Sequence, residues 1–129
     1  MTPESGARPV IVQKYGGSSL ANAKLIHNAA KRICTLKDDG TDVIVVVSAM
    51  GDSTDSLIAL SSAVTGEATP DAREMDNLLS TGEMVSATLM AMALNTRGYG
   101  AISLSGGQAG IKTDSVHGSA RIADINTDR

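Results

Sequence analysis

The sequence predicts an α/β fold, a three-layer α/β/α sandwich around a mostly parallel sheet. Two β-branched runs, residues 10–15 and 42–48, flank a segment of helical periodicity, as in a βαβ unit. The second run, DVIVVVS, is apolar without alternation. This pattern is typical of a parallel strand that is covered on both faces, so we expect it to be the central strand.

The first strand and the helix after it have clear local signals. The run VIVQKY over residues 10–15 ends in two glycines, which is typical of a strand that enters a tight turn. Apolar residues then recur at intervals of three and four, and we expect that helix to end near Gly40. The residues that would form its apolar face are Ile26, Ala29, Ala30, Ile33 and Leu36.

The middle of the chain predicts three further helices. Thr54 or Asp55 can cap the first of them, and a break is expected over residues 65–70. The other two are expected over residues 72–79 and from about residue 82 to residue 96. The side chains expected to face inward are Leu57, Ile58, Leu60 and Val64 on the first helix, and Val85, Leu89, Met92 and Ala93 on the last.

The last part of the chain predicts strands. Residues 101–105, AISLS, are expected to form a third strand. Residues 111–113 and 120–126 are expected to pair as a hairpin across the loop DSVHG.

Composition limits the partners of the protein. The net charge of −3 provides no broad cationic surface, so nucleic acid is not an expected partner. The longest purely apolar run, residues 43–47, is far shorter than the roughly 20 residues of a membrane span, and no secretory signal is recognisable. We expect a cytoplasmic protein with no membrane partner. Residues 1–8 are expected to be a disordered lead-in.

The core is expected to be aliphatic. The 129 residues, enough for one compact domain, include two Tyr and no Phe or Trp. The one cysteine, Cys34, is expected to be a small buried hydrophobe in a reducing compartment.

The loop after the first strand is a candidate phosphate site. Ligands of parallel sheets bind at the carboxyl ends of strands, and this loop offers Lys14, Tyr15, Gly16, Gly17 and Ser18 there. Glycines let backbone N–H groups approach phosphate oxygens, while a lysine adds a full positive charge. The spacing matches neither a Walker A loop nor a Rossmann loop, and a plain strand-to-helix turn is the alternative.

Two further loops are candidates for binding anions or an ammonium group. Ser48, Asp52, Ser53 and Thr54 follow the second strand and could hold a carboxylate or phosphate, although helix capping explains some of them equally well. Glu83 is expected to open a helix, where it would either complement the helix dipole or receive a substrate ammonium group.

No metal site or covalent nucleophile is expected. His27 and His117 have no acidic or cysteine partner at metal-ligand spacing, so solvated or hydrogen-bonded histidines are favoured. Ser18 and Ser48 lack the G-x-S-x-G context of a serine hydrolase.

Four long motifs, taken together, resemble the N-terminal part of aspartate kinases. They are VQKYGGSS, VVSAMGDSTD, EMDNLLSTGEMVS and SGGQAGIKTDSVHGSARI. The resemblance covers residues 10–129 and implies an incomplete amino-acid kinase fold. It also implies transfer of the γ-phosphoryl group of ATP, as its Mg²⁺ complex, to the β-carboxylate of L-aspartate. This reaction is the entry to lysine, threonine, methionine and diaminopimelate biosynthesis.

The same resemblance implies roles for individual residues. Lys14 corresponds to the catalytic lysine, which also binds phosphate, and Tyr15, Gly16, Gly17 and Ser18 belong to the phosphate loop. Ser48 falls at a position that contacts the nucleotide or its phosphate. The residues implied in binding the aspartate substrate are Asp52, Ser53, Thr54 and Glu83, the last holding its amino group.

The sequence departs from the family pattern after residue 129. Aspartate kinases continue with a second, nucleotide-binding half of the kinase domain and with regulatory ACT domains, so residues 9–129 are expected to be the N-terminal portion of the domain. The alternatives are a catalytically silent fragment that needs the missing half or a partner, and another amino-acid kinase acting on glutamate or acetylglutamate. We expect the isolated chain to be inactive and to self-associate through an unpaired sheet edge or an apolar face.

Overall fold

The computed structural model describes residues 6–128. Residues 1–5 of the expected lead-in lie outside the described residues, and residues 6–9 form no regular element. None of the helices in this described part is long and apolar enough to cross a membrane.

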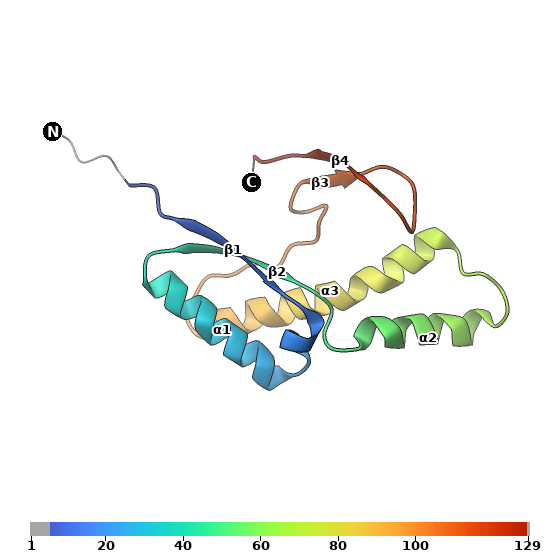
Figure 1. The fold of residues 1–129 in the computed structure, drawn as a ribbon, viewed down its shortest axis with the longest axis horizontal. Helices are drawn as coiled ribbons and strands as arrows, with labels where there is room; N and C mark the ends of the chain where they lie inside the picture. The colour runs from blue at the N-terminus through green and yellow to red at the C-terminus, as the bar shows by residue number, and fades with distance from the viewer. Residues whose placement is uncertain (1–5, 129) are drawn as a thin grey trace.

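The N-terminal unit is the predicted βαβ arrangement. Strand β1 (Val10–Tyr15) pairs in parallel with β2 (Asp42–Val47), so that Lys14 lies opposite Val46. Between them, a short 3-10 helix η1 (Gly17–Leu20) leads into α1 (Ala23–Asp38), as Figure 1 shows. Asn22 caps α1 by accepting a hydrogen bond from the Leu25 amide at 3.0 Å. The predicted end of this helix is confirmed, because Gly40 follows with a φ of +86°.

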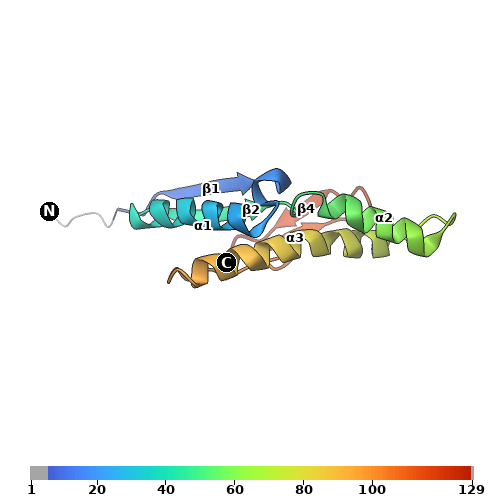
Figure 2. The same ribbon diagram turned by 90° about the horizontal axis from the view of Figure 1, so that it is seen from below.

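One long helix replaces two of the predicted helices. The prediction of a break between residues 79 and 82 is wrong: α3 (Ala72–Asn95) is continuous, and α2 (Ser53–Thr65) packs beside its first half (Figures 1 and 2). Helix α3 is capped by Asp71, which accepts from the Glu74 amide at 3.0 Å. Gly82 is buried inside the helix, and its function there is close packing rather than termination.

The predicted third strand is absent from the described residues. At Ala101 the side-chain amide of Asn95 bonds both backbone groups, accepting from the N–H at 2.8 Å and donating to the carbonyl at 3.2 Å. Those groups are then not available to a neighbouring strand, and β2 pairs with β1 alone within residues 6–128. The predicted hairpin is confirmed as β3 (Ile111–Thr113) and β4 (Ile122–Ile125), which are antiparallel.

The core lies on one face of the β1–β2 sheet. Val43, Val45 and Val47 pack against buried residues of α1 and α3, and the predicted burial of Cys34 is confirmed. The other face exposes Val12 and Ile44, so the described residues supply one helical layer of the predicted sandwich. The predicted α/β class with a parallel sheet is confirmed, whereas the prediction that β2 is covered on both faces is wrong for residues 6–128.

Several predicted inward-facing side chains are exposed. On α2, the prediction is wrong for Ile58, Leu60 and Val64, because this helix packs on α3 and not on the sheet. On α3, Ala93 is buried as predicted, but the stripe formed by the other predicted side chains is exposed. The buried face of the helix is therefore rotated from the predicted one. The exposed side chains of that stripe are Val85, Leu89 and Met92.

Candidate functional site

Lys14 and Ser48 are neighbours at the carboxyl ends of the two parallel strands. The ammonium group of Lys14 donates a hydrogen bond to Ser48 Oγ at 3.4 Å, although the two residues are 34 positions apart. The parallel register produces this contact, because β1 and β2 end side by side. Two of the predicted phosphate-contacting residues are therefore brought together.

The loops after β1 and β2 are joined through their backbones. The Ser48 amide donates to the Tyr15 carbonyl at 3.0 Å, and the Gly51 amide donates to the Gly17 carbonyl at 2.9 Å. A Cβ on Gly17 would lie 2.7 Å from the Ala49 carbonyl oxygen, closer than side-chain atoms approach. Gly17 is therefore required for the two loops to meet.

The other residues of the first loop differ in what they offer. Gly16 faces open space, since a Cβ there would have no neighbour within 4 Å, and Ser18 is exposed in η1. Tyr15 faces the other way. Its ring is buried in the core with the Arg32 guanidinium carbon 5.9 Å from the ring centre, and its hydroxyl donates to Gln13 Oε1 at 2.9 Å.

The second loop leads directly into α2. This helix begins at Ser53, so the prediction that Thr54 or Asp55 caps it is wrong. Asp52 occupies the N-cap position, yet its side chain makes no capping hydrogen bond in the described structure. Ser53 Oγ is buried and has no hydrogen-bond partner among the described residues. The start of α2 therefore keeps polar groups that are not used by the fold.

Helix α3 touches this loop at its midpoint. Ser86 Oγ donates to the Ser48 carbonyl at 2.7 Å, and a Cβ on Gly82 would lie 2.9 Å from Ala49 Cβ. Glu83 follows Gly82 immediately and is exposed. Because Glu83 lies inside a helix, the prediction that it opens one and complements a helix dipole is wrong.

Sequence reasoning missed Gly82 and Ser86 as residues that shape this site. Their signal is present in the sequence, since two small residues separated by four positions allow close approach of a helix to its neighbour. The same residues also fit a helix start, which is what the sequence predicts there.

The two histidines lie in different parts of the chain. His27 is exposed on α1, and His117 Nδ1 lies 3.0 Å from Asp76 Oδ2, so the predicted hydrogen-bonded role holds for His117. Across the described residues, no group of three or more His, Cys, Asp or Glu side chains is placed to hold a metal ion.

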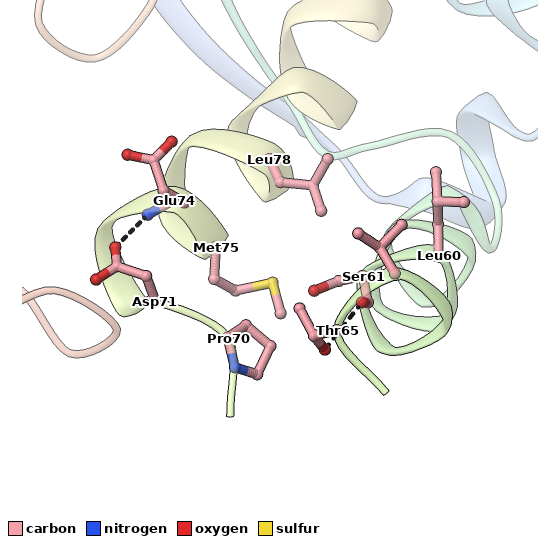
Figure 3. Close-up of a pocket in the computed structure, with 9 residues that line it drawn as sticks. Leu60, Ser61, Thr65, Pro70, Asp71, Glu74, Met75 and Leu78 are labelled. Carbon is pink, nitrogen blue, oxygen red and sulfur yellow. Dashed lines mark hydrogen bonds between the residues drawn. The ribbon is translucent and has the colours of Figure 1, made fainter. Parts of the chain in front are cut away.

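A separate apolar groove of about 260 Å³ lies between the end of α2 and the start of α3 (Figure 3). Met75 and Leu78 lie on the α3 side of the groove, Leu60 lines it from α2, and Pro70 lies near the start of α3. It contains none of the predicted site residues.

The comparisons with known proteins agree with this arrangement. A family model described as "Amino acid kinase family" matches residues 9–129. The chain belongs to this family. Among curated members, the chain is 52% identical over 118 residues to "Aspartokinase 2" of Bacillus subtilis and 52% identical over 120 residues to "Aspartokinase" of Corynebacterium glutamicum. These alignments cover 92% and 93% of the chain but 28% of each relative, so the chain spans little more than a quarter of their length.

A solved structure shares the fold of this chain over most of its length. The chain superposes on "Crystal Structure of Aspartate Kinase from Synechocystis" with a TM-score of 0.74 and 46% sequence identity. The superposition covers 80% of this chain and 17% of that one.

Proposed function

We propose that the chain is the N-terminal portion of an aspartate kinase, which phosphorylates the β-carboxylate of L-aspartate with ATP to give 4-phospho-L-aspartate. The observation that carries this proposal is the contact between Lys14 and Ser48, 3.4 Å apart where the loops after β1 and β2 are joined. Relatives about 50% identical and named aspartokinase support the choice of substrate. The product would feed lysine, threonine, methionine and diaminopimelate synthesis in the cytoplasm.

The phosphate side of the site would stabilise spreading negative charge. In phosphoryl transfer, negative charge is distributed over the oxygens of the moving group, and most of the catalysis is positioning and charge neutralisation. Lys14 supplies a full positive charge, while Gly16, which faces open space, and Gly17 and Ser18 at the start of η1 offer backbone N–H groups. Mg²⁺ would arrive as the complex with ATP.

The attacking carboxylate needs no general base. A free aspartate side chain has a pKa of about 3.9, so it is already ionised at neutral pH. The requirement is that two anions are held in line, which is a problem of orientation.

The amino-acid side would use the start of α2 and the middle of α3. Asp52, Ser53 and Thr54 surround a helix N-terminus, whose partial positive charge favours a substrate carboxylate. The buried hydroxyl of Ser53 can donate to such a ligand. Glu83 would bind the substrate ammonium group and thereby select an amino acid over a simple dicarboxylate.

A hybrid enzyme tests the proposal. Residues 9–129 would replace the matching segment of the Corynebacterium glutamicum aspartokinase, which is 52% identical. ATP-dependent hydroxamate formation would then be measured with aspartate, glutamate and acetylglutamate. We expect turnover with aspartate. Preference for either other substrate would indicate a different amino-acid kinase, and a folded hybrid that is inactive with all three would contradict the proposal.

A further inference from the structure

Ser86 links α3 to the loop that carries Ser48. Its side chain is fully buried, and Oγ lies 2.7 Å from the Ser48 carbonyl oxygen. The carbonyls of Glu83 and Gly82 in its own helix are farther away, at 3.1 and 3.4 Å. A hydroxyl has one hydrogen to donate, so the short contact identifies Ser48 as its main acceptor.

The same loop also contacts α3 at Gly82, one helical turn before Ser86. Gly82 has no Cβ, and one placed there would lie 2.9 Å from Ala49 Cβ. Adjacent residues of the loop, Ser48 and Ala49, therefore meet two residues of α3 that lie on one face of the helix. This double contact determines how far α3 lies from the loop.

The contact joins the two sides of the site. On one side Ser48 Oγ accepts from the Lys14 ammonium group at 3.4 Å. On the other side Glu83 lies in α3 between the two contact residues, Gly82 and Ser86. A shift of the helix relative to the loop would change the separation of Lys14 and Glu83.

We propose that Ser86 is a positioning residue that sets the separation between the phosphate-binding loops and the turn of α3 that carries Glu83. The proposal rests on the proposed function, which assigns phosphate to Lys14 and the substrate ammonium group to Glu83. Phosphoryl transfer requires the attacking oxygen in line with the phosphorus, and a misplacement of about 1 Å can cost about 100-fold in rate. Ser86 acts through Ser48 and α3, without contacting either substrate.

Three variants separate the hydrogen bond from simple packing. Ser86→Ala removes the donor and leaves a small void, while Ser86→Cys leaves no void and supplies only a weak donor on a slightly larger atom. Ser86→Thr keeps the hydroxyl. The control is Ser62→Ala: Ser62 is an exposed helical serine that donates to the Ile58 carbonyl at 3.1 Å, on α2 and away from the loop.

Amide hydrogen exchange of the full 129-residue chain tests the structural link between Ser86 and the loop that carries Ser48. This test makes no assumption about activity. The reporters are the Ser48 and Gly51 amides, which bond to Tyr15 and Gly17. We expect Ser86→Ala and Ser86→Cys to speed exchange at both reporters by about 3- to 10-fold, as the loss of one hydrogen bond predicts. Ser86→Thr and Ser62→Ala should leave it unchanged. Unchanged exchange in Ser86→Cys would overturn the proposal.

Kinetics of the hybrid enzyme test the positioning role. We expect Ser86→Cys to lower kcat by about 10-fold or more, with KM for aspartate changed by less than about 3-fold, since alignment matters most in the transition state. Ser86→Thr should recover most of the rate. A normal kcat in Ser86→Cys would contradict the positioning role and leave Ser86 only a role in packing. A hybrid that is inactive with Ser86 intact would contradict the proposed function instead, while the exchange result still decides the structural link.

Discussion

Lys14 and Tyr15 are adjacent in the chain and face opposite sides of the sheet. Strand alternation places the Tyr15 ring in the core and the Lys14 ammonium group at the exposed strand end beside Ser48. The family motif includes both residues, but the structure gives them different surroundings. The tyrosine ring packs in the core, whereas the lysine ammonium group is the one that a ligand can reach.

Replacing Lys14 tests the proposed charge neutralisation. In the hybrid enzyme, Lys14→Ala should lower kcat by about 100-fold or more while KM for aspartate changes little, because the positive charge is needed most in the transition state. The control is Lys31→Ala, at an exposed position of α1. Equal kcat in the Lys14 and Lys31 variants would remove Lys14 from the catalytic role.

Tyr99 is a second residue with a testable charge state. Its hydroxyl donates to Asp38 Oδ1 at 2.6 Å, and this hydrogen bond, followed by desolvation and the Asp38 charge, raises the pKa of Tyr99 from 10.0 to about 12. The folded state thus favours the protonated phenol. The stabilisation is fully present below pH 10 and is lost as the pH rises through about 12.

NMR titration of ring-labelled tyrosine would measure this shift. We expect Asp38→Asn to lower the pKa of Tyr99 towards its ordinary value, because the charge and the strong acceptor are both removed. The neighbouring Asp39→Asn is the control. A Tyr99 pKa that stays near 12 in Asp38→Asn would show that Asp38 is not its cause.

At the scale of elements, the middle of α3 is the part that the sequence did not reveal. Gly is usually unfavourable inside a helix, so residues 80–83 resemble a boundary. The actual reason for Gly82 is its contact with Ala49, which belongs to a loop more than thirty positions earlier in the chain. Local pattern cannot show a contact between such distant segments.

A double-mutant cycle would measure this contact. Helix propensity alone predicts that Gly82→Ala stabilises α3 by about 1 kcal/mol, whereas the 2.9 Å approach to Ala49 Cβ predicts destabilisation. We expect the second effect to win, and Ala49→Gly to restore part of the loss by making room. Urea unfolding of the four proteins gives the coupling, and additive effects would contradict the contact.

Elements with strong local signals were predicted well. Strand β1, helix α1, strand β2 and the β3–β4 hairpin follow from apolar periodicity and glycine positions, and each was confirmed. Residues 101–105 have the composition of a strand, but Asn95 and Gln108 bond backbone groups at its two ends. Strand composition does not reveal a side chain that competes for those groups.

At the scale of the whole molecule, the sheet has one covered and one exposed face. The core lies between the β1–β2 sheet and the helices α1 and α3. On the other face Val12 is 63% exposed and Ile44 is 54% exposed. The predicted three-layer sandwich requires a second set of helices here, which the described residues do not include.

This face predicts how the isolated chain behaves. We expect the 129-residue chain to self-associate with rising concentration, because burying exposed apolar surface is favourable. Sedimentation velocity should show less association for the pair Ile44→Thr and Val46→Thr. The control is Val116→Thr in the hairpin loop, also an exposed valine. Equal association of control and double variant would exclude this face as the contact.

The connection between the β3–β4 hairpin and α3 has a consequence for local unfolding. Both strands are exposed along their length, and the Asp76 carboxylate accepts from the Gly118 amide at 3.0 Å and contacts His117. An element with few buried contacts opens at lower free energy than the core. The hairpin is therefore expected to detach as a unit while β1, β2 and the long helix stay folded. A trypsin-like protease, which cuts after Lys and Arg, should then cut first at Lys112 and Arg121.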